Sequence, residues 1–567
     1  MSAPILRRTA VVVVIGALAV GAVLVRRDTG GRSERRAVPS PPTPEIAAAP
    51  ADLAAPVTRI ATDPSAPDPL TIVEHAHTAV VTAPGPDRLR AAAHLAITLR
   101  APLVIASVDT ATDAASDPTS APAPARHDAA AALRRMDVVR AVLVGDAVTE
   151  QAARDGGVRE IVRLRPTTAD RPSVRRLIRW AAGGGTPGAR SDPGFGEHAV
   201  RDLADSMPEP AAPTGVATLV RPRGAQALHV ALAARAVGHA VVPTRADDLR
   251  GDARLIERLA DLADDGQPPR VIVGGRDTAA LDRPGVAAQV AVAATGVQLP
   301  GHGQLVIDPR RPHARRYVGL YGVPRSAALG ALGEQPVAAT VARTRRLARE
   351  YQRVVGADAD IVGCLEIIAT VASASAGPDG DYANELSVAE LEPAVRAARR
   401  AGLYVLLDIQ PGRTDFVTQA RRYRRLLRHP HVGLALDPEW RLRPGERHLQ
   451  QIGSVGIDEV NEVADWLADL TRRSRLPQKM LLIHQFRLSM VRERERLDTR
   501  RDELAYVIQM DGQGPQGSKL ETWHAITAAP PDRVHFGWKN FYDEDTPVRS
   551  PEETMALTPP PVFVSYQ

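Results

Sequence analysis

Short apolar runs alternate with amphipathic segments from residue 315 to the end of the chain. The amphipathic segments are predicted helices; one of them, residues 387–402, begins at Ser387, a residue type that caps helices, and ends at Gly402. The connections after the sixth and seventh runs are less clearly helical. The eight apolar runs are predicted strands at residues 315–322, 360–369, 403–410, 431–440, 479–486, 504–511, 533–540 and 561–567. Eight strand-then-helix units in about 250 residues are typical of a TIM barrel. An open doubly wound sheet is the alternative.

Two earlier stretches repeat one pattern of apolar runs and helices. Residues 78–107 and 216–244 each give a strand, a turn with Gly, a helix rich in Ala and Leu, and a second strand. Their continuous apolar strands predict parallel sheets that are covered on both faces. Neither copy contains G-x-G-x-x-G or G-K-[ST], so we expect no nucleotide cofactor. The predicted fold is therefore α/β: two Rossmann-like βαβ units at 69–175 and 214–305, a linker at 176–213, and a (β/α)8 TIM barrel at 312–567.

The N-terminus carries an apolar segment between pairs of arginines. Residues 9–25 are seventeen uncharged, mostly apolar residues, and a helix of that length nearly spans about 30 Å of hydrocarbon. The run continues past a possible cleavage site at residues 17–19, which favours a retained anchor over a cleaved signal peptide. A buried N-terminal helix is the alternative. We predict a signal or membrane anchor at 1–27 and a stalk rich in Pro and Ala at 28–68. The rest of the chain is expected to be extracytoplasmic and associated with the cell wall, either anchored to the membrane or secreted.

Composition narrows the class of protein. With 44% hydrophobic and 24% charged residues, the chain fits a folded soluble protein and neither a multi-span membrane protein nor a disordered one. Only three of its 71 basic residues are Lys, and Arg is spread through every region, so the net charge of +5 does not indicate a nucleic-acid partner. The single cysteine, Cys364, excludes an internal disulfide framework and a multi-cysteine metal site.

Polar residues end most of the predicted barrel strands. In a barrel these ends converge on the C-terminal face, where TIM-barrel active sites lie. We therefore expect the convergence to be functional. The aromatic face of Trp440 could stack on a sugar ring, although core packing is its default role. The candidate substrate-binding residues are Tyr321, Gln410, Trp440, His484, Gln485, Asp511, Lys539 and Tyr566.

The end of the fourth strand carries two carboxylates, Asp437 and Glu439. On a regular strand, residues two apart share a face, so both side chains could reach the cavity. Their repulsion would raise one pKa, as a general acid at neutral pH requires, and glycosidic cleavage uses such a pair. We predict Glu439 as proton donor, Asp437 as its partner, and Asp408 or Glu366 as a second carboxylate. Alternatively, Asp437 caps the loop and Glu439 is solvated.

A metal site at His484 is a weaker possibility. His484 could bind zinc together with Asp408, Asp437 and Asp511, but no H-E-x-x-H or H-x-H pair fixes two ligands locally. A hydrogen-bonded histidine in a polar pocket is favoured, and we expect neither a metal nor a cofactor. The chain has no G-x-S-x-G nucleophile elbow, so a serine hydrolase is not predicted.

Each of the two repeated units resembles the putative cell-wall-binding repeat type 2. The resemblance rests on the Ala-rich helix, on residues 101–104 (APLV), and on the V-G-G strand end at residues 273–275. The first copy departs from it, with Gly145-Asp146 where the family has Gly-Gly. The resemblance implies a polysaccharide partner in the cell wall, with the membrane reached through the N-terminal segment.

The fourth barrel strand, VGLALDPEW, resembles the D-x-E ending of family 18 chitinase-like glycoside hydrolases. In that family the Glu is the proton donor and the Asp supports a substrate-assisted intermediate. Val432 and Ala435 stand where the family has two further Asp, and residues 508–511 (IQMD) lack its Tyr. The resemblance implies hydrolysis of cell-wall or extracellular polysaccharide. The alternatives are a noncatalytic surface-binding protein with a degenerate barrel and a metal-dependent hydrolase that uses His484.

Overall fold

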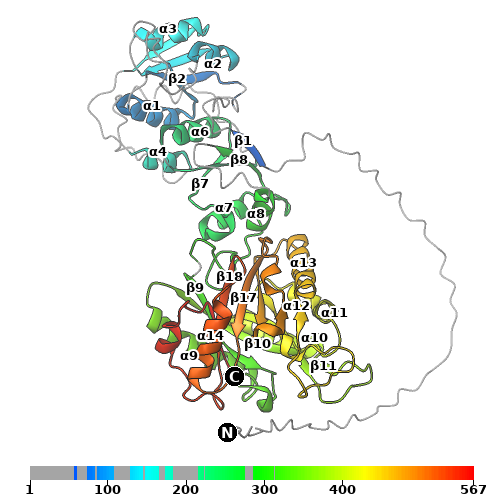
Figure 1. Ribbon diagram of the computed structural model, residues 1–567. Coiled ribbons are helices and arrows are strands. Elements are labelled where there is room, and N and C mark those ends of the chain that lie inside the picture. Colours follow the sequence, from blue (N-terminus) through cyan, green and yellow to red (C-terminus); the bar gives the residue numbers. More distant parts are fainter. Residues whose placement is uncertain are drawn as a thin grey trace, which may run out of the picture.

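A closed barrel of eight parallel strands forms the C-terminal half of the molecule (Figure 1). Each strand pairs with the next along the chain, and the last pairs with the first, so the TIM-like barrel is confirmed and the open sheet is wrong. The strands are β9 (Arg315–Gly322), β10 (Asp360–Ala372), β12 (Tyr404–Ile409), β13 (Val432–Leu436), β15 (Lys479–His484), β17 (Leu504–Met510), β18 (Val534–Asn540) and β19 (Phe563–Tyr566). This computed structural model describes residues 57–60, 73, 75–83, 86–106, 128–144, 147–164, 173–182, 215–222, 224–274, 285–311 and 313–567.

Helices cover the outside of the barrel. They are α9 (Val337–Val355), α10 (Val388–Ala401), α11 (Phe416–Arg422), α12 (Arg424–Leu427), α13 (Ile457–Arg473), α14 (Gln516–Thr527) and α15 (Pro551–Met555). The expected cap of α10 is present: Ser387 and Glu390 form a capping box, and Gly402 ends the helix in a left-handed conformation. The connections after β17 and β18, whose patterns are weak, contain the short helices α14 and α15.

Loops at the C-terminal ends of the strands add small elements. They are the 3₁₀ helices η5 (Ala327–Leu329), η6 (Pro438–Trp440), η7 (Leu488–Met490) and η8 (Arg494–Arg496), and the strands β11 (Ala383–Glu385), β14 (Val455–Gly456) and β16 (Val491–Arg492). β11 pairs antiparallel with the end of β10, and β14 pairs parallel with β16. These additions make up part of the surface around the mouth of the barrel.

Side chains alternate between the barrel interior and the helix layer. Near the starts of the strands, inward-facing apolar residues such as Tyr317, Tyr404 and Met480 form one buried cluster. Outward-facing residues such as Val318 and Leu434 pack in a second cluster with residues of the helices. The floor of the barrel is therefore apolar.

Residues 299–307 close this floor. Leu299, Val306 and Ile307 belong to the interior apolar cluster. The side-chain oxygen of Gln478 accepts hydrogen bonds from the backbone N–H groups of Val306 and Ile307, at 2.9 and 3.2 Å. We expected the second α/β unit to end at residue 305. The packing shows instead that residues 299–307 belong to the barrel.

Two four-stranded parallel sheets precede the barrel. The first sheet has the strand order β3-β2-β4-β5. Its strands are β2 (Thr78–Thr82), β3 (Leu103–Ile105), β4 (Arg140–Val144) and β5 (Glu160–Arg163). The helices of this part are α1 (Pro86–Leu99), α2 (Ala129–Arg135), α3 (Ala147–Asp155) and α4 (Val174–Ala181). In the second, the order β1-β8-β6-β7 comes from β1 (Val57–Ile60), β6 (Val216–Val220), β7 (Ala240–Pro243) and β8 (Arg270–Gly274), with η3 (Leu249–Gly251) and helices α6 (Gly224–Ala236), α7 (Ala253–Asp261) and α8 (Val286–Ala293). The orders β3-β2-β4 and β7-β6-β8 repeat one topology, as the duplicated sequence predicts.

Two predicted boundaries in this region are corrected. β1 lies within the stretch expected to be a stalk, and it pairs parallel with β8 at the edge position that β5 occupies in the first sheet. Helix α4 runs across the expected start of the linker at residue 176, and its Trp180 is buried in a cluster shared with α1 and α6. The two sheets are therefore joined through a common helical core.

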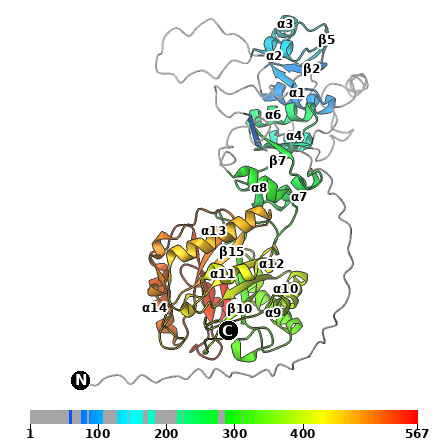
Figure 2. The ribbon, with the colours of Figure 1, turned by 90° about the vertical axis from the view of Figure 1, so that its right-hand side faces the viewer.

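The α/β sheets lie beyond one end of the barrel, with α7 and α8 nearest to it (Figure 2). Arg250 and Arg475 connect the two parts by donating hydrogen bonds to the backbone oxygens of Asp502 and Gly266, at 2.9 and 2.7 Å. Among the described residues no helix is long and apolar enough to cross a membrane. The expected anchor at residues 9–25 lies outside the described residues.

Candidate active site

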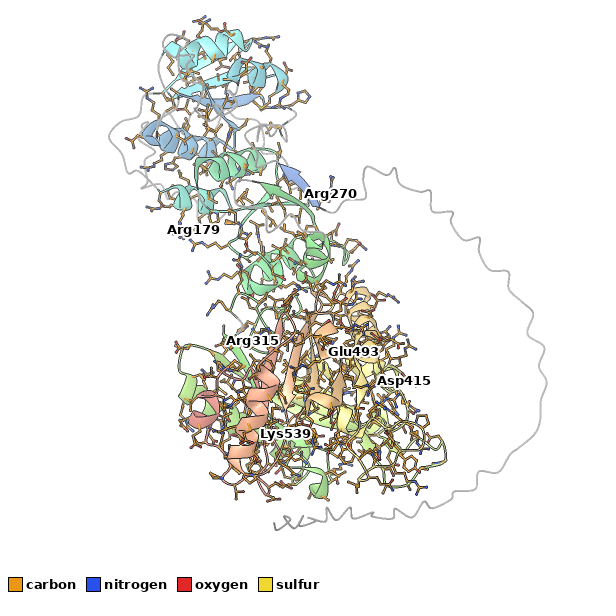
Figure 3. The ribbon with its side chains drawn as sticks, viewed as in Figure 1. Arg179, Arg270, Arg315, Asp415, Glu493 and Lys539 are labelled. Atoms are coloured by element: carbon orange, nitrogen blue, oxygen red, sulfur yellow. The ribbon has the colours of Figure 1, made fainter. Side chains whose placement is uncertain are left out.

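The inward-facing positions become polar toward the C-terminal ends of the barrel strands. Because side chains alternate along a strand, the final inward position of each strand points into one layer. Figure 3 labels Lys539, at the end of β18, at the end of the barrel farther from the α/β sheets. The layer is buried and contains Tyr321, Glu366, Asp408, His484, Gln509, Lys539 and Ser565.

His484 occupies the centre of the layer and is surrounded by carboxylates. Its Nε2 lies 3.2 Å from Glu366 Oε1 and 3.6 Å from Asp408 Oδ1, and its Nδ1 lies 3.0 Å from Asp511 Oδ2. These distances fit ion pairs, but the ring N–H groups are not aligned for hydrogen bonds. Burial disfavours the charged ring, yet Asp408, Asp511 and Glu366 outweigh it and hold the pKa of His484 well above its usual value. These carboxylates therefore favour the protonated form of His484.

Tyr321 joins this cluster to a second cation. Its hydroxyl donates to Asp408 Oδ2 at 2.8 Å and accepts from Gln410 Nε2 at 3.1 Å. The Nζ of Lys539 lies 3.3 Å from the centroid of the Tyr321 ring. Burial raises the pKa of Tyr321 well above its usual value, and the charges of Asp408 and its neighbours raise it further. Tyr321 therefore stays a hydrogen-bond donor.

Asp437 and Glu439 lie at the rim of the layer in different environments. Strand β13 ends before Asp437, and Pro438 begins the 3₁₀ helix that carries Glu439. Asp437 is buried; burial and the charges of Asp408, Asp511 and Glu439 hold its pKa well above the usual range, against the opposing effect of His484. Glu439 is half-buried, and burial together with Asp511 raises its pKa to about 7, although Lys539 and His484 lower it.

Several carboxylate oxygens of the cluster lack hydrogen-bond partners within the described residues. Both oxygens of Glu366, and one each of Asp408, Asp437 and Asp511, are buried without a hydrogen bond. Of these, Glu366 Oε1 and Asp408 Oδ1 lie within ion-pair distance of His484 Nε2, and the others have no charged partner this close among the described residues. Buried carboxylates in a purely structural role are normally satisfied, because desolvation without a partner is costly. The unmatched oxygens instead fit a site that receives polar groups from outside the chain.

No family model and no curated protein matches this chain. We therefore infer the chemistry of the cluster from its geometry. Five carboxyl groups, one imidazole and one lysine side chain meet at the face where TIM-barrel enzymes act. The elevated pKa values of Asp437 and Glu439 are typical of acid–base catalysis.

Three predicted site residues do not join the cluster. Gln485 is buried but accepts a hydrogen bond from Arg494 Nη1 at 2.9 Å, away from His484. The Tyr566 hydroxyl lies 2.7 Å from that of Tyr351 on α9, on the helix side of β19. Trp440 is half-buried, with its ring edge-on to His448 at 5.3 Å between centroids.

Two members of the buried layer were missing from the predicted site. Gln509 Nε2 donates to Ser565 Oγ at 2.7 Å, and both residues are buried. Gln509 lies on β17, two residues before Asp511, so strand alternation already placed its side chain on the same side as that of Asp511. Ser565 lacks such a signal because its strand is short and mostly apolar.

The geometry does not favour a metal at His484. Glu366 and Asp408 lie against Nε2, while Asp511 lies against the opposite ring nitrogen, so their oxygens do not surround one point. The described residues that come close enough together to share an ion are Asp379, Asp381 and Glu385, before and on β11. The carboxylate of Asp381 already accepts hydrogen bonds from Ala383 N and Thr414 Oγ1, at 2.8 and 2.9 Å.

Proposed function

We propose that this protein is an extracytoplasmic glycoside hydrolase that cleaves cell-wall or extracellular polysaccharide. One observation carries the proposal: Glu439, with a pKa of about 7, lies half-buried at the rim of a carboxylate–histidine layer. A carboxyl group with this pKa is partly protonated at neutral pH, as a general acid requires. No metal or cofactor enters the proposed reaction.

Glu439 donates its proton to the glycosidic oxygen as the bond from that oxygen to the anomeric carbon breaks. The developing positive charge on the sugar is stabilised by a carboxylate below it, Asp408 or Glu366, while Asp437 acts as the partner of Glu439. Water supplies the hydroxyl group to the anomeric carbon, and its remaining proton restores Glu439. His484 and Lys539 act as positioning residues, because they hold several carboxylates together that would otherwise repel one another.

The N-terminal half of the chain provides attachment in this proposal. The resemblance of the duplicated units to cell-wall-binding repeats, together with the apolar segment at residues 9–25, supports a place at the cell envelope. The wall polysaccharide and the membrane are then the partners.

The test is the release of reducing ends from isolated cell-wall polysaccharide. Since general acids contribute about 10²–10⁴-fold, Glu439→Gln should lower the rate at least about 100-fold. Glu521→Gln, an exposed carboxylate on α14, is the matched control and should leave the rate unchanged. Equal rates for the wild type and Glu439→Gln would contradict the assignment.

A noncatalytic surface-binding protein is the second candidate. It is favoured by the burial of Glu366, Asp408 and His484, each with no exposed surface. In the same assay this alternative gives polysaccharide binding without any release of reducing ends.

A further inference from the structure

A pocket of about 400 Å³ is lined by residues of the loops at the mouth of the barrel, and none of its lining side chains takes part in the catalytic proposal. Loops after β12, β13 and β15 form it. Its volume falls within the ~300–1,000 Å³ of small-molecule sites. Its polar lining consists mainly of Arg413, Arg441, Arg443, Arg492, Ser454 and Glu459.

The charges in this pocket do not balance. Arg441 is paired with Glu459, with 3.0 Å between Nε and Oε1. Arg413, Arg443 and Arg492 form no ion pair with any carboxylate among the described residues. Three guanidinium groups thus face one cavity without a counter-charge, which favours an anionic ligand.

The arginines are held in place by neutral groups. Arg492 Nη1 and Arg443 Nη2 both donate to Ser454 Oγ, at 2.5 and 3.3 Å, so two like charges are kept together. Arg413 lies over the Tyr382 ring, with 4.5 Å from Cζ to the centroid. Its Nη2 donates to the backbone oxygen of Glu446 at 3.0 Å, which also holds the guanidinium in place.

A helix end contributes to the same pocket. Gly456, which lines it, precedes the first residue of the 17-residue helix α13 and provides no side-chain cap. The positive end of the helix dipole adds to the attraction for an anion, and the two carboxylates of the first turn, Asp458 and Glu459, are each paired with an arginine. Arg441 neutralises Glu459, which lies in the first turn of this helix.

The pocket is joined to the catalytic loop. Arg441 follows Glu439 by two residues, so their Cα atoms are at most about 7 Å apart. The backbone N–H of Gly453, the residue before Ser454, donates to the backbone oxygen of Glu439 at 2.7 Å. A sugar chain at Glu439 would therefore reach the arginines with a neighbouring residue.

We propose that this pocket binds the carboxylate or phosphate group of an acidic polysaccharide whose scissile bond lies at Glu439. The role as a substrate subsite rests on the function proposed above. The acidic group would accept paired hydrogen bonds from the arginines, while the mouth holds the adjoining sugars.

Calorimetric binding to the full chain carrying Glu439→Gln tests this proposal without hydrolysis. The probes are hexagalacturonate for the carboxylate, a glycerol-phosphate oligomer for the phosphate, and maltohexaose as the neutral glycan. We expect one acidic probe to bind, and the added pair Arg443→Gln and Arg492→Gln to weaken that binding at least about tenfold. Arg353→Gln, an exposed arginine at the end of α9, is the matched control and should keep the affinity.

Salt provides a second readout that a folding defect would not imitate. Raising salt should weaken the acidic probe's binding to the parent chain more than its binding to the double-arginine variant. Binding of neither acidic probe, equal binding of all three probes, or unchanged affinity in the double-arginine variant would overturn the proposal.

The two proposals fail in different ways. Arginine-dependent binding without release of reducing ends overturns the hydrolase and leaves the pocket as the ligand site of a binding protein. Release of reducing ends at a rate that is equal for neutral and acidic polysaccharides, and unaffected by the arginine substitutions, overturns the pocket and leaves the hydrolase.

Discussion

Two carboxyl groups two residues apart, Asp437 and Glu439, differ in exposure because their surroundings differ. Asp437 is buried beside Asp408 and Asp511, whereas Glu439 remains partly exposed on a 3₁₀ helix. Both pKa values are raised, but only Glu439 can meet a ligand from solvent and exchange protons near neutral pH. This combination makes Glu439 the better proton donor.

The pH dependence of activity follows from Glu439. The rate should fall on the alkaline side with an apparent pKa near 7, because the donor must be protonated. Lys539 lowers the pKa of Glu439, so Lys539→Met should move this limb to higher pH. Measurement of kcat/KM between pH 4 and 10 checks both expectations. An alkaline limb that stays in place in Lys539→Met would argue against Glu439 as the donor.

The same carboxyl group makes stability depend on pH. The pKa of Glu439 is 4.5 in the unfolded chain and about 7 in the folded one. Below pH 4.5 the group is protonated in both states and does not change the free energy of unfolding. Above pH 7 it is charged in both states, and burial of the charge lowers the free energy of unfolding by its full amount. Glu439→Gln should therefore stabilise the barrel at pH 8 by about 1–3 kcal/mol and leave it nearly unchanged at pH 4. Thermal unfolding at the two pH values measures this difference, and an equal effect at both would contradict the assigned pKa.

Strand alternation decides which predicted residues meet. Tyr321, Glu366, Asp408 and His484 share the inward phase of their strands, so the sequence could place them together. Gln485 follows His484 directly and therefore points to the opposite face of the strand. Strand alternation thus already argued against placing both residues in one site. The end of the fourth strand is different. Pro438 already marked the point where the strand would end, but only the structure shows that Glu439 lies on a 3₁₀ helix.

At the scale of elements, the connection between β13 and α13 supplies both Glu439 and much of the arginine pocket. Gly453 is packed where this connection folds back on itself. A Cβ atom there would lie 2.4 Å from the backbone oxygen of Glu439 and 2.5 Å from that of Arg441. The two candidate sites are therefore coupled by one tight backbone contact.

Gly453→Ala should displace Glu439 and lower the release of reducing ends by at least about tenfold, since small misplacements of catalytic groups are costly. Gly517→Ala, on α14 with open space around it, is the matched control and should retain activity. Parallel unfolding curves show whether each variant is folded. Full activity in Gly453→Ala would show that the loop yields without moving Glu439.

A buried ion pair connects α14 to the segment after β18. Lys519 Nζ contacts the carboxylate of Asp545 and donates to the backbone oxygen of Lys539 at 2.8 Å. Lys519→Met leaves Asp545 buried and uncompensated, so it should cost about 3–5 kcal/mol in the free energy of unfolding. Denaturant titration measures the loss. Lys479→Met is the comparison, because Lys479 donates to the backbone oxygens of His429 and Val432 and has no acidic partner among the residues that the structure describes. A loss below about 1 kcal/mol for Lys519→Met would contradict the importance of the pair.

At the scale of the molecule, the eight-strand barrel followed from counting apolar runs, but its floor did not. Residues 299–307 have neither strand nor helix periodicity, so nothing in their pattern assigned them to the barrel. Their packing became visible only in three dimensions, as did the pairing of β1 with a strand more than 200 residues later.

A chain that begins at residue 297 should therefore fold as a soluble barrel, whereas a chain that begins at residue 313 should not. The shorter chain lacks Val306 and Ile307, exposes the apolar floor around Tyr317 and leaves Gln478 without two donors. Size-exclusion chromatography and cooperative thermal unfolding distinguish the two chains. Equal behaviour would show that the floor segment is dispensable.

The strand direction of the barrel separates the α/β sheets from the carboxylate–histidine layer. Arg315, at the start of β9, lies toward the α/β sheets, and Lys539, at the end of β18, lies toward the opposite end (Figure 3). A surface bound by the α/β sheets would therefore lie at the opposite end of the barrel from the carboxylate–histidine layer. Under the proposed function, such an enzyme would leave intact the polysaccharide chain that its α/β sheets bind, and it would cleave neighbouring chains farther from that attachment.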